Sequence, residues 1–289
     1  MTYGIPYHLG CSVWSLPGWV GTFYTDTAKP GDYLGQYASV FNTVEGNTTF
    51  YTIPDEQRLQ RWSDIVPTDF KFCFKIHQSI THDKLLDVSQ QELDDFILRF
   101  DVLRMNLGPF IIQLPKSFTP VILVRLEKFI EMLPANMSYA VEVRHLDFFD
   151  KGLHEHQLDQ LLKSFNADKV IFDTRKLHAT VSNEPSIIEA KKKKPKMPVR
   201  FEASGSRPVL RFVGTNNAMD SEAYLKEWAI IVAEWIKTGH HPYVFIHTPD
   251  QVSQPKLCYH FHHLLSNLLD LNPLKEWPVN RQDKQLGLF

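Results

Sequence analysis

Ionisable and amide side chains follow the ends of several short apolar runs in this sequence of 289 residues. Glu142 and Arg144 form the clearest pair, because they alternate with two valines and therefore share one face of an extended strand. With the valines packed outward, this pair points towards the interior of a sheet or barrel. Comparable positions are occupied by Glu45, Asn47, Lys75, His77, Gln113, His145, Asp173, Arg211 and His247. Their convergence predicts a polar pocket at one end of the strands.

These residue types suit chemistry on an anion such as a phosphate ester. Arginine and lysine bind phosphate oxygens, a carboxylate can act as general base, alone or through a divalent metal, and a histidine can donate the proton. The predicted catalytic residues are Glu142, His145, Asp173 and His77. The predicted substrate-binding residues are Glu45, Asn47, Lys75, His82, Gln113, Arg144, Arg211, His247 and Trp14. No HExxH or similar ligand spacing occurs, so the metal is left open.

A structural alternative exists for the charged pair. Glu142 and Arg144 could form a buried ion pair that serves the fold alone, since structural networks also perturb ionisable groups. For the whole rim a functional pocket is favoured, because burying several charges without a use costs several kcal/mol per ion unless each is paired.

Eight short runs rich in Val, Ile and Phe predict the strands that would position these residues. They are His8–Val13, Asn42–Thr49, Phe70–Ile76, Pro109–Leu114, Ser138–Arg144, Lys169–Asp173, Pro208–Val213 and Pro242–His247. Helical periodicity separates them, most clearly in the apolar stripe from Leu225 to Ile236, with Ser221 as the expected cap. The pattern predicts an α/β fold with a single (β/α)₈ TIM-type barrel. A doubly wound open sheet is the alternative, but no GxGxxG follows the first run.

Two segments depart from the strand–helix repeat. Residues 178–207 are expected to form a long loop with a short helix, and they contain the basic run Lys191–Lys196. Residues 278–289 are polar until their last positions and are expected to form a mobile tail. The predicted domains are therefore a barrel over residues 1–277 and a tail over 278–289.

Composition limits the classes of function. The formal net charge of −2 provides no global basic field for nucleic acid or an anionic membrane, so any such contact needs a local patch. The three widely spaced cysteines predict neither a disulfide framework nor a cysteine zinc site. Residues 1–10 lack the pattern of a secretory signal, and no apolar stretch is long enough to cross a membrane. We therefore expect a cytoplasmic protein.

Several motifs resemble the YecE-like family (domain of unknown function 72) over about Tyr7 to Leu271. The resemblance lies in Gly10–Trp14, Trp19–Tyr24, Val44–Tyr51, Ile80–His82, Gln113–Pro115 and Val141–His145. It points to the branch after which the family is named, and it implies a TIM-type barrel like those of endonuclease IV and xylose isomerase relatives. It implies no reaction. The broader family tends to carry paired asparagines on the last strand, whereas this chain has His247 and Thr248.

The last five residues, Gln285-Leu286-Gly287-Leu288-Phe289, resemble the peptide by which bacterial polymerases and repair factors dock on the DNA sliding clamp. Leu286, Leu288 and Phe289 would supply apolar contacts, while Gln285 would form hydrogen bonds. Chance occurrence or a tail that folds back are the alternatives. The run Lys191–Lys196 with Arg200 could neutralise phosphates, although most such runs are solvated surface.

The favoured hypothesis is a phosphate-ester or nucleic-acid-processing enzyme, leaning towards a hydrolase, which the sliding clamp recruits. Two alternatives stay open. One is a non-catalytic adaptor that binds a ligand or partner in the barrel. The other is an enzyme of sugars or sugar phosphates without a role on nucleic acid. A nucleic acid or a phosphorylated small molecule is accordingly the expected ligand, and no membrane partner is expected.

Overall fold

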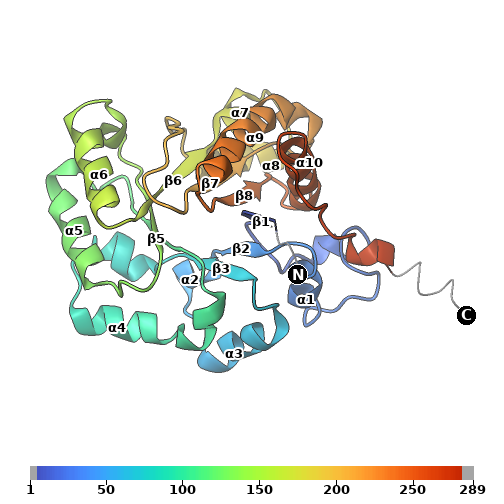
Figure 1. The fold of residues 1–289 in the computed structure, drawn as a ribbon, viewed down its shortest axis with the longest axis horizontal. Coiled ribbons are helices and arrows are strands. Elements are labelled where there is room, and N and C mark those ends of the chain that lie inside the picture. The colour runs from blue at the N-terminus through green and yellow to red at the C-terminus, as the bar shows by residue number, and fades with distance from the viewer. Residues whose placement is uncertain (1–4, 282–289) are drawn as a thin grey trace, which may run out of the picture.

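The computed structural model describes residues 5–281, which form parallel strands surrounded by helices (Figure 1). Each predicted strand overlaps an observed one. Within the described residues the strands are β1 (His8–Cys11), β2 (Thr43–Gly46), β3 (Lys71–Phe74), β4 (Phe110–Gln113), β5 (Tyr139–Glu142), β6 (Asp168–Asp173), β7 (Val209–Val213) and β8 (Tyr243–His247). The strand order is therefore well predicted by short apolar runs between turn residues.

The strands pair in two parallel ladders. One is a six-stranded sheet in the order β1-β8-β7-β6-β5-β4, which curls into half a barrel, and the other joins β2 to β3. The ladder between β3 and β4 is reduced to isolated bridges, from Phe72 to Leu107 and from Lys75 to Ile111. The expected parallel α/β fold is confirmed, in the form of a curled half-barrel sheet, while the described residues do not form a continuous eight-stranded ladder.

Side chains hold β1 beside β2 where no backbone ladder joins them. The Asn42 side chain accepts from the Leu9 amide at 2.8 Å and donates to the Tyr7 carbonyl at 2.8 Å. The Tyr37 hydroxyl accepts from the Cys11 amide at 2.7 Å and donates to the Thr43 carbonyl at 2.9 Å. These contacts satisfy buried backbone groups that a β ladder would otherwise pair.

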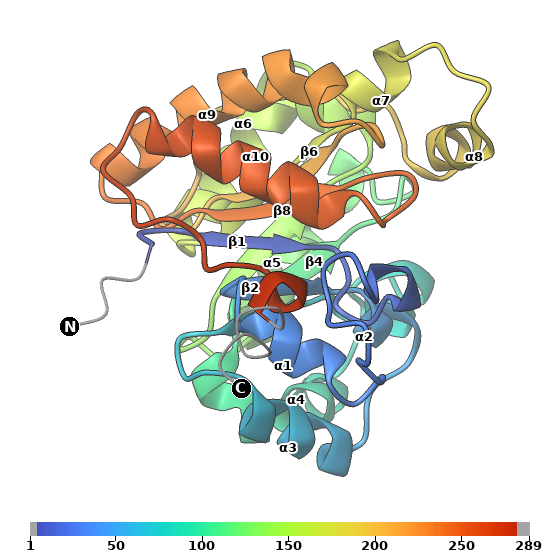
Figure 2. The ribbon, with the colours of Figure 1, turned by 90° about the vertical axis from the view of Figure 1, so that its right-hand side faces the viewer.

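Helices cover the outside of the strands on both sides in the turned view (Figure 2). The stripe predicted from Leu225 to Ile236 lies in α9, and its core-facing members pack against the sheet. Ser221 precedes α9, but its hydroxyl accepts from the Thr215 amide and does not cap the helix. The helices are α1 (Tyr33–Ala38), α2 (Thr48–Tyr51), α3 (Glu56–Ile65), α4 (Gln90–Leu98), α5 (Leu123–Met132), α6 (Leu153–Ser164), α7 (Arg175–Ala179), α8 (Pro185–Lys193), α9 (Glu222–Lys237) and α10 (Gln254–Ser266).

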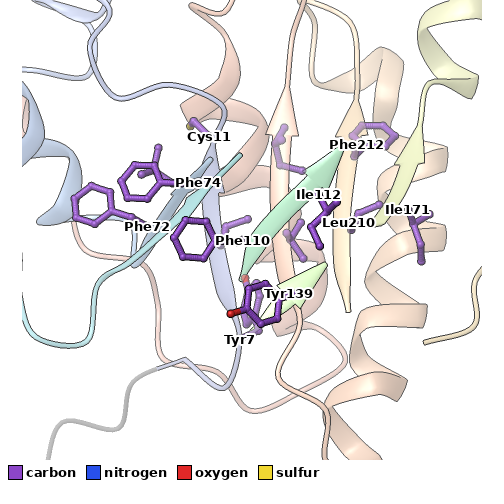
Figure 3. Close-up of a cluster of buried hydrophobic side chains, with 14 of the residues drawn as sticks. Tyr7, Cys11, Phe72, Phe74, Phe110, Ile112, Tyr139, Ile171, Leu210 and Phe212 are labelled. Atoms are coloured by element: carbon purple, nitrogen blue, oxygen red, sulfur yellow. The ribbon is translucent and has the colours of Figure 1, made fainter. Parts of the chain in front are cut away.

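Aromatic rings fill much of the core between strands and helices (Figure 3). Phe72 and Phe74 stack with their centroids 5.4 Å apart, and Phe74 packs against Phe100 at 5.2 Å. Phe110 continues the cluster through an edge contact with Phe100 at 5.3 Å. Large buried rings contribute strongly to hydrophobic stabilisation, so this packing fixes the strands whose ends carry the polar residues.

The two exceptional segments take defined positions. Between β6 and β7 the chain forms α7 and α8, so the basic run begins inside a helix and continues past its end. Residues 278–281 form a helical turn held against the loop before α1 and the end of α1, since the Val279 amide donates to the Phe23 carbonyl at 3.3 Å and Arg281 donates to Ser39. Ordered structure thus extends beyond the predicted boundary at 277, and the clamp-like peptide lies outside the described residues.

Two expectations from composition can be compared with the described residues. Cys11, Cys73 and Cys258 are buried and free, as expected for cysteines without a disulfide framework. None of the helices within residues 5–281 is long and apolar enough to cross a membrane.

Candidate functional site

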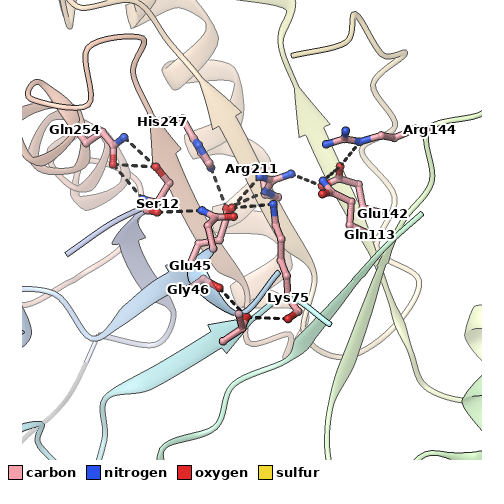
Figure 4. Close-up of polar contacts among 12 residues, drawn as sticks. Ser12, Glu45, Gly46, Lys75, Gln113, Glu142, Arg144, Arg211, His247 and Gln254 are labelled. Atoms are coloured by element: carbon pink, nitrogen blue, oxygen red, sulfur yellow. Dashed lines mark hydrogen bonds and ion pairs between the residues drawn. The ribbon is translucent and has the colours of Figure 1, made fainter. Parts of the chain in front are cut away.

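Arg211 stands at the centre of a buried ion-pair network inside the curled sheet (Figure 4). Its Nε and Nη2 atoms donate to the two Glu45 carboxylate oxygens, each at 2.8 Å. Its Nη1 atom donates to Glu142. The guanidinium also lies 4.7 Å from the centroid of the Phe172 ring. One arginine therefore joins two carboxylates that come from the two separate ladders, Glu45 from β2 and Glu142 from β5.

Three further side chains complete the hydrogen bonding of the two carboxylates. The imidazole Nε2 of His247 lies 2.9 Å from Glu45. Gln113 Nε2 donates to Glu142 Oε1 at 2.6 Å, and Arg144 Nε donates to the same oxygen at 2.9 Å. The predicted placement of Glu142 and Arg144 on one face is confirmed, and the two side chains form an ion pair.

The network keeps both carboxylates ionised. Burial alone would raise the pKa of Glu142, but Arg211 and Arg144 outweigh burial and hold that pKa well below its usual range. Burial would likewise raise the pKa of Glu45, yet Arg211, His247 and Lys75 lower it well below the usual value. A carboxylate with so low a pKa is a weak base, so this geometry does not favour Glu142 as a general base.

A cavity of about 890 Å³ opens above the network at the carboxyl ends of the strands. Seven predicted site residues share its lining, namely Asn47, Lys75, His82, Gln113, Arg144, Arg211 and His247. Glu45 and Glu142 lie beneath them and are 0% and 1% exposed. The cavity and its polar lining match the pocket predicted from the strand ends.

Helix α8 adds a part of the cavity that the sequence reasoning missed. Ser186, Glu189, Ala190, Lys193 and Lys194 line the cavity from this segment. The Lys193 ammonium pairs with Glu189 at 2.6 Å, whereas the Lys194 ammonium has no hydrogen bond or ion pair to a residue within 5–281 and lies 5.8 Å from the Phe172 ring centroid. The basic run in the sequence indicated that lysines gather in this segment. Only the path of α8 over the strand ends shows which of these lysines line the cavity.

Four titratable side chains of the lining are less basic than usual. Burial and the nearby Arg211 lower the pKa of Lys75 to about 7 and that of Lys194 to about 8. Burial lowers the pKa of His247 to about 4 despite its contact with Glu45. Burial and Arg144 also lower the pKa of His82. Both histidines are therefore neutral at pH 7, and each lysine has a neutral fraction there.

Comparisons with known proteins match this architecture. The family described as "Protein of unknown function DUF72" matches residues 8–280. The chain belongs to the DUF72 family. The UPF0759 protein YecE of Escherichia coli strain K12 is 35% identical over 252 residues, which cover 87% of this chain and 90% of that protein.

Two solved DUF72 structures share the fold. The protein from Thermotoga maritima has a TM-score of 0.70 and 23% identity, with 90% of this chain and 99% of that chain covered. The protein from Enterococcus faecalis has a TM-score of 0.67 and 16% identity, with 93% and 99% covered. DUF72 membership therefore accounts for the fold and leaves the chemistry to the site itself.

Besides Asp173, three predicted site residues do not reach the cavity of this DUF72 chain. Trp14 packs edge-on against Trp62 at 5.0 Å and lines a separate surface depression. His77 contacts the Ser79 hydroxyl at 2.8 Å and the Tyr51 carbonyl at 3.2 Å. His145 precedes the short helix at 146–149, where its Nδ1 accepts from the Asp147 amide. Their positions at strand ends were predicted correctly, but their side chains make local contacts there.

Asp173 is directed away from the cavity. Its carboxylate accepts from the Trp228 indole at 2.7 Å and forms a fork with Arg175, whose Nη2 lies 2.8 Å away. Phe172 occupies the inner face at this level, so the next residue points outward to α9 because side chains alternate along a strand. The prediction that Asp173 acts in the pocket is therefore wrong in its geometry.

The described residues give no geometric support for a divalent metal. None of them forms a group of three or more His, Cys, Asp or Glu side chains that could hold one. The oxygens of Glu45 and Glu142 are already shared among cations and Gln113. The chemistry of this site is accordingly best considered in terms of its amines, guanidinium groups and imidazoles.

Proposed function

We propose that this protein is an enzyme that binds a small phosphorylated molecule in the cavity. The observation that carries the proposal is the presence of two cations with unused donors at the cavity wall. The Lys194 ammonium forms no ion pair with a residue among 5–281, and the terminal nitrogens of Arg144 make no hydrogen bond to a described residue. Cations of this kind are suited to a phosphate, which accepts several charge-assisted hydrogen bonds.

Each cation has a distinct part in the proposed binding. Glu142 holds Arg144 at Nε, which leaves the two terminal nitrogens in a fixed plane for phosphate oxygens. Lys194 adds a point charge near the face of Phe172. Arg211 was also predicted to bind the phosphate. Its guanidinium donates to Glu45 and Glu142 instead, and it holds the ion-pair network below the cavity.

The proton-transfer role passes from the carboxylates to His82 in this proposal. Its Nδ1 contacts the Thr81 hydroxyl at 2.9 Å, and its ring packs edge-on against Phe50. Because burial and Arg144 lower its pKa, the imidazole is neutral and can accept a proton. We also infer that the two ladders work as one barrel-like wall around the ligand, in the manner of a TIM barrel.

The test is calorimetric titration of inorganic phosphate into the full chain and into Lys194→Gln and Arg144→Gln. Each substitution removes one or two charge-assisted hydrogen bonds worth about 1.5–3 kcal/mol, so we expect a loss of roughly tenfold to a hundredfold in affinity. The matched control is Lys192→Gln on the same helix, because Lys192 is exposed and does not line the cavity. Equal affinity in all four proteins, or no binding by the native chain, would remove the proposal.

Three outcomes of related assays distinguish the possible functions of the site. Turnover of p-nitrophenyl phosphate that is lost in His82→Gln would support hydrolysis of a phosphate ester. Binding of oligonucleotides that weakens with salt and with Lys194→Gln would support a nucleic-acid substrate. Phosphate binding without turnover of any phosphate ester would favour the ligand-binding adaptor.

The sequence supports a second proposal, that Gln285–Phe289 docks on the DNA sliding clamp. The chain just before it is attached beside α1 through Arg281 and Ser39, and residues 278–281 take no part in the cavity lining. Recruitment and ligand binding would then use different parts of the molecule.

A further inference from the structure

Lys75 lies at the floor of the cavity, and its ammonium lacks the close partners of a lysine that serves the fold alone. Its side chain is 8% exposed, and the residue belongs to the cavity lining. Its Nζ has no hydrogen bond to a residue within 5–281, and its ion-pair partner Glu45 is 3.5 Å away. That separation exceeds the roughly 2.7–2.9 Å of a charge-assisted hydrogen bond.

Glu45 has closer partners than Lys75 on both of its oxygens. One oxygen accepts from Arg211 Nε and contacts His247, and the other accepts from Arg211 Nη2. A buried ammonium normally requires close anionic or polar partners to repay its desolvation. Lys75 has one distant shared carboxylate, and the face of Phe50 lies 6.0 Å from its Nζ.

The charges around Lys75 also disfavour its protonated form. Arg211 and Arg144 act against the ammonium, while Glu45 and Glu142 act for it but are occupied by those same arginines. Burial and Arg211 accordingly lower the pKa of Lys75 to about 7. A desolvated lysine beside cationic groups is the usual form of an amine that attacks carbonyl carbon.

We propose that Lys75 forms an imine with the aldehyde or ketone of a phosphorylated substrate whose phosphate is held by Arg144 and Lys194. The inference rests on the proposed function for the phosphate and adds the substrate class, a phosphorylated carbonyl compound. It places nucleophile and anion site in the same cavity of about 890 Å³.

The step balances without any oxidant or reductant. The lone pair of neutral Nζ forms a bond to the carbonyl carbon, and the oxygen gains the proton that the nitrogen loses, which gives a carbinolamine. The remaining proton of the nitrogen passes to that hydroxyl, which leaves as water as the nitrogen lone pair forms the C=N bond. His82, which lines the same cavity and is neutral near pH 7, is placed to accept and return the proton.

Pyridoxal 5′-phosphate is the probe, since it carries an aldehyde and a phosphate on one small molecule. The full chain is treated with a sub-stoichiometric amount, reduced with borohydride and mapped by peptide mass spectrometry. We expect the label on Lys75 at least tenfold above any exposed lysine, a labelling rate that rises through about pH 7, and protection by inorganic phosphate. Pyridoxal, which lacks the phosphate, should label Lys75 at least tenfold more slowly.

Variants separate this inference from the proposed function. Lys75→Arg should lose the label, and Lys193→Arg, at an exposed lysine of the same cavity, should keep it. Labelling of Lys194, or labelling spread over surface lysines in the native chain, would overturn the assignment even if Lys75→Arg failed to fold. Phosphate binding without any specific label would overturn the imine alone, whereas absence of phosphate binding would overturn both proposals.

Discussion

Replacement of Arg211 by methionine tests whether the central network holds the fold as an electrostatic unit. The change leaves Glu45 and Glu142, 0% and 1% exposed, without the guanidinium that donates to both. Removal of one partner from a buried ion pair costs about 3–5 kcal/mol, because the remaining charge stays desolvated. We expect that loss of unfolding free energy at pH 7 and a fall in Tm on the order of 10 °C.

The pH dependence of this loss gives the sharper test. In the native chain the pKa values of Glu45 and Glu142 are lowered on folding, so their stabilisation is present above the unfolded pKa near 4.3 and disappears as pH falls through the folded values. Without Arg211, burial raises these pKa values, so the carboxylates become neutral at a higher pH. The difference between the two proteins should therefore be largest at neutral pH and should already shrink as the pH falls from 7 to 4.

Urea denaturation followed by circular dichroism at several pH values provides the measurement. The control is Arg104→Met, because Arg104 pairs with Asp101 at 2.7 Å in a site where both side chains are about half exposed. That pair should contribute less than about 1 kcal/mol at any pH. A loss for Arg211→Met no larger than the control, or one that stays constant from pH 7 to pH 4, would refute the reasoning.

Two further predictions concern regions outside the cavity. Trp228→Phe removes the indole donor to Asp173 and should lower the unfolding free energy by about 1–3 kcal/mol more than Trp235→Phe on the same helix, with phosphate affinity unchanged in both, as measured by urea titration and calorimetry. A tenfold loss of phosphate affinity in Trp228→Phe would instead indicate that Asp173 contributes to the binding site. Deletion of Gln285–Phe289 should abolish binding to a bacterial sliding clamp in surface plasmon resonance and leave Tm unchanged, whereas clamp binding by the shortened chain would exclude the peptide as the docking element.

The positions of the strands could be predicted because each is a short apolar run bounded by turn residues. The run Pro109–Leu114, for example, contains the observed strand Phe110–Gln113. The hydrogen-bond partners between strands could not be predicted in the same way. An apolar pattern does not reveal that Asn42 and Tyr37 bridge β1 and β2 with their side chains. The curled sheet was therefore predictable, and the interruptions of its ladder were not.

The alternation of side chains along a strand predicted part of the site. It failed in the strand where polar and apolar residues do not alternate between an exposed and a buried face. Glu142 and Arg144 alternate with valines, which fixed their inward direction correctly. Every residue of β6 is buried, so the pattern could not show that Phe172 faces inward and Asp173 outward to Trp228. The position of Lys194 in the cavity could not be predicted from the pattern either, because it depends on the path of α8 after β6.

The most direct test of the phosphate site is a crystal structure of the full chain grown with pyridoxal 5′-phosphate without reductant. We predict density for the phosphate between the terminal nitrogens of Arg144 and the Lys194 ammonium, with the aldehyde carbon directed towards Lys75. An unchanged empty cavity at saturating probe, or a phosphate bound only at another surface, would contradict the account.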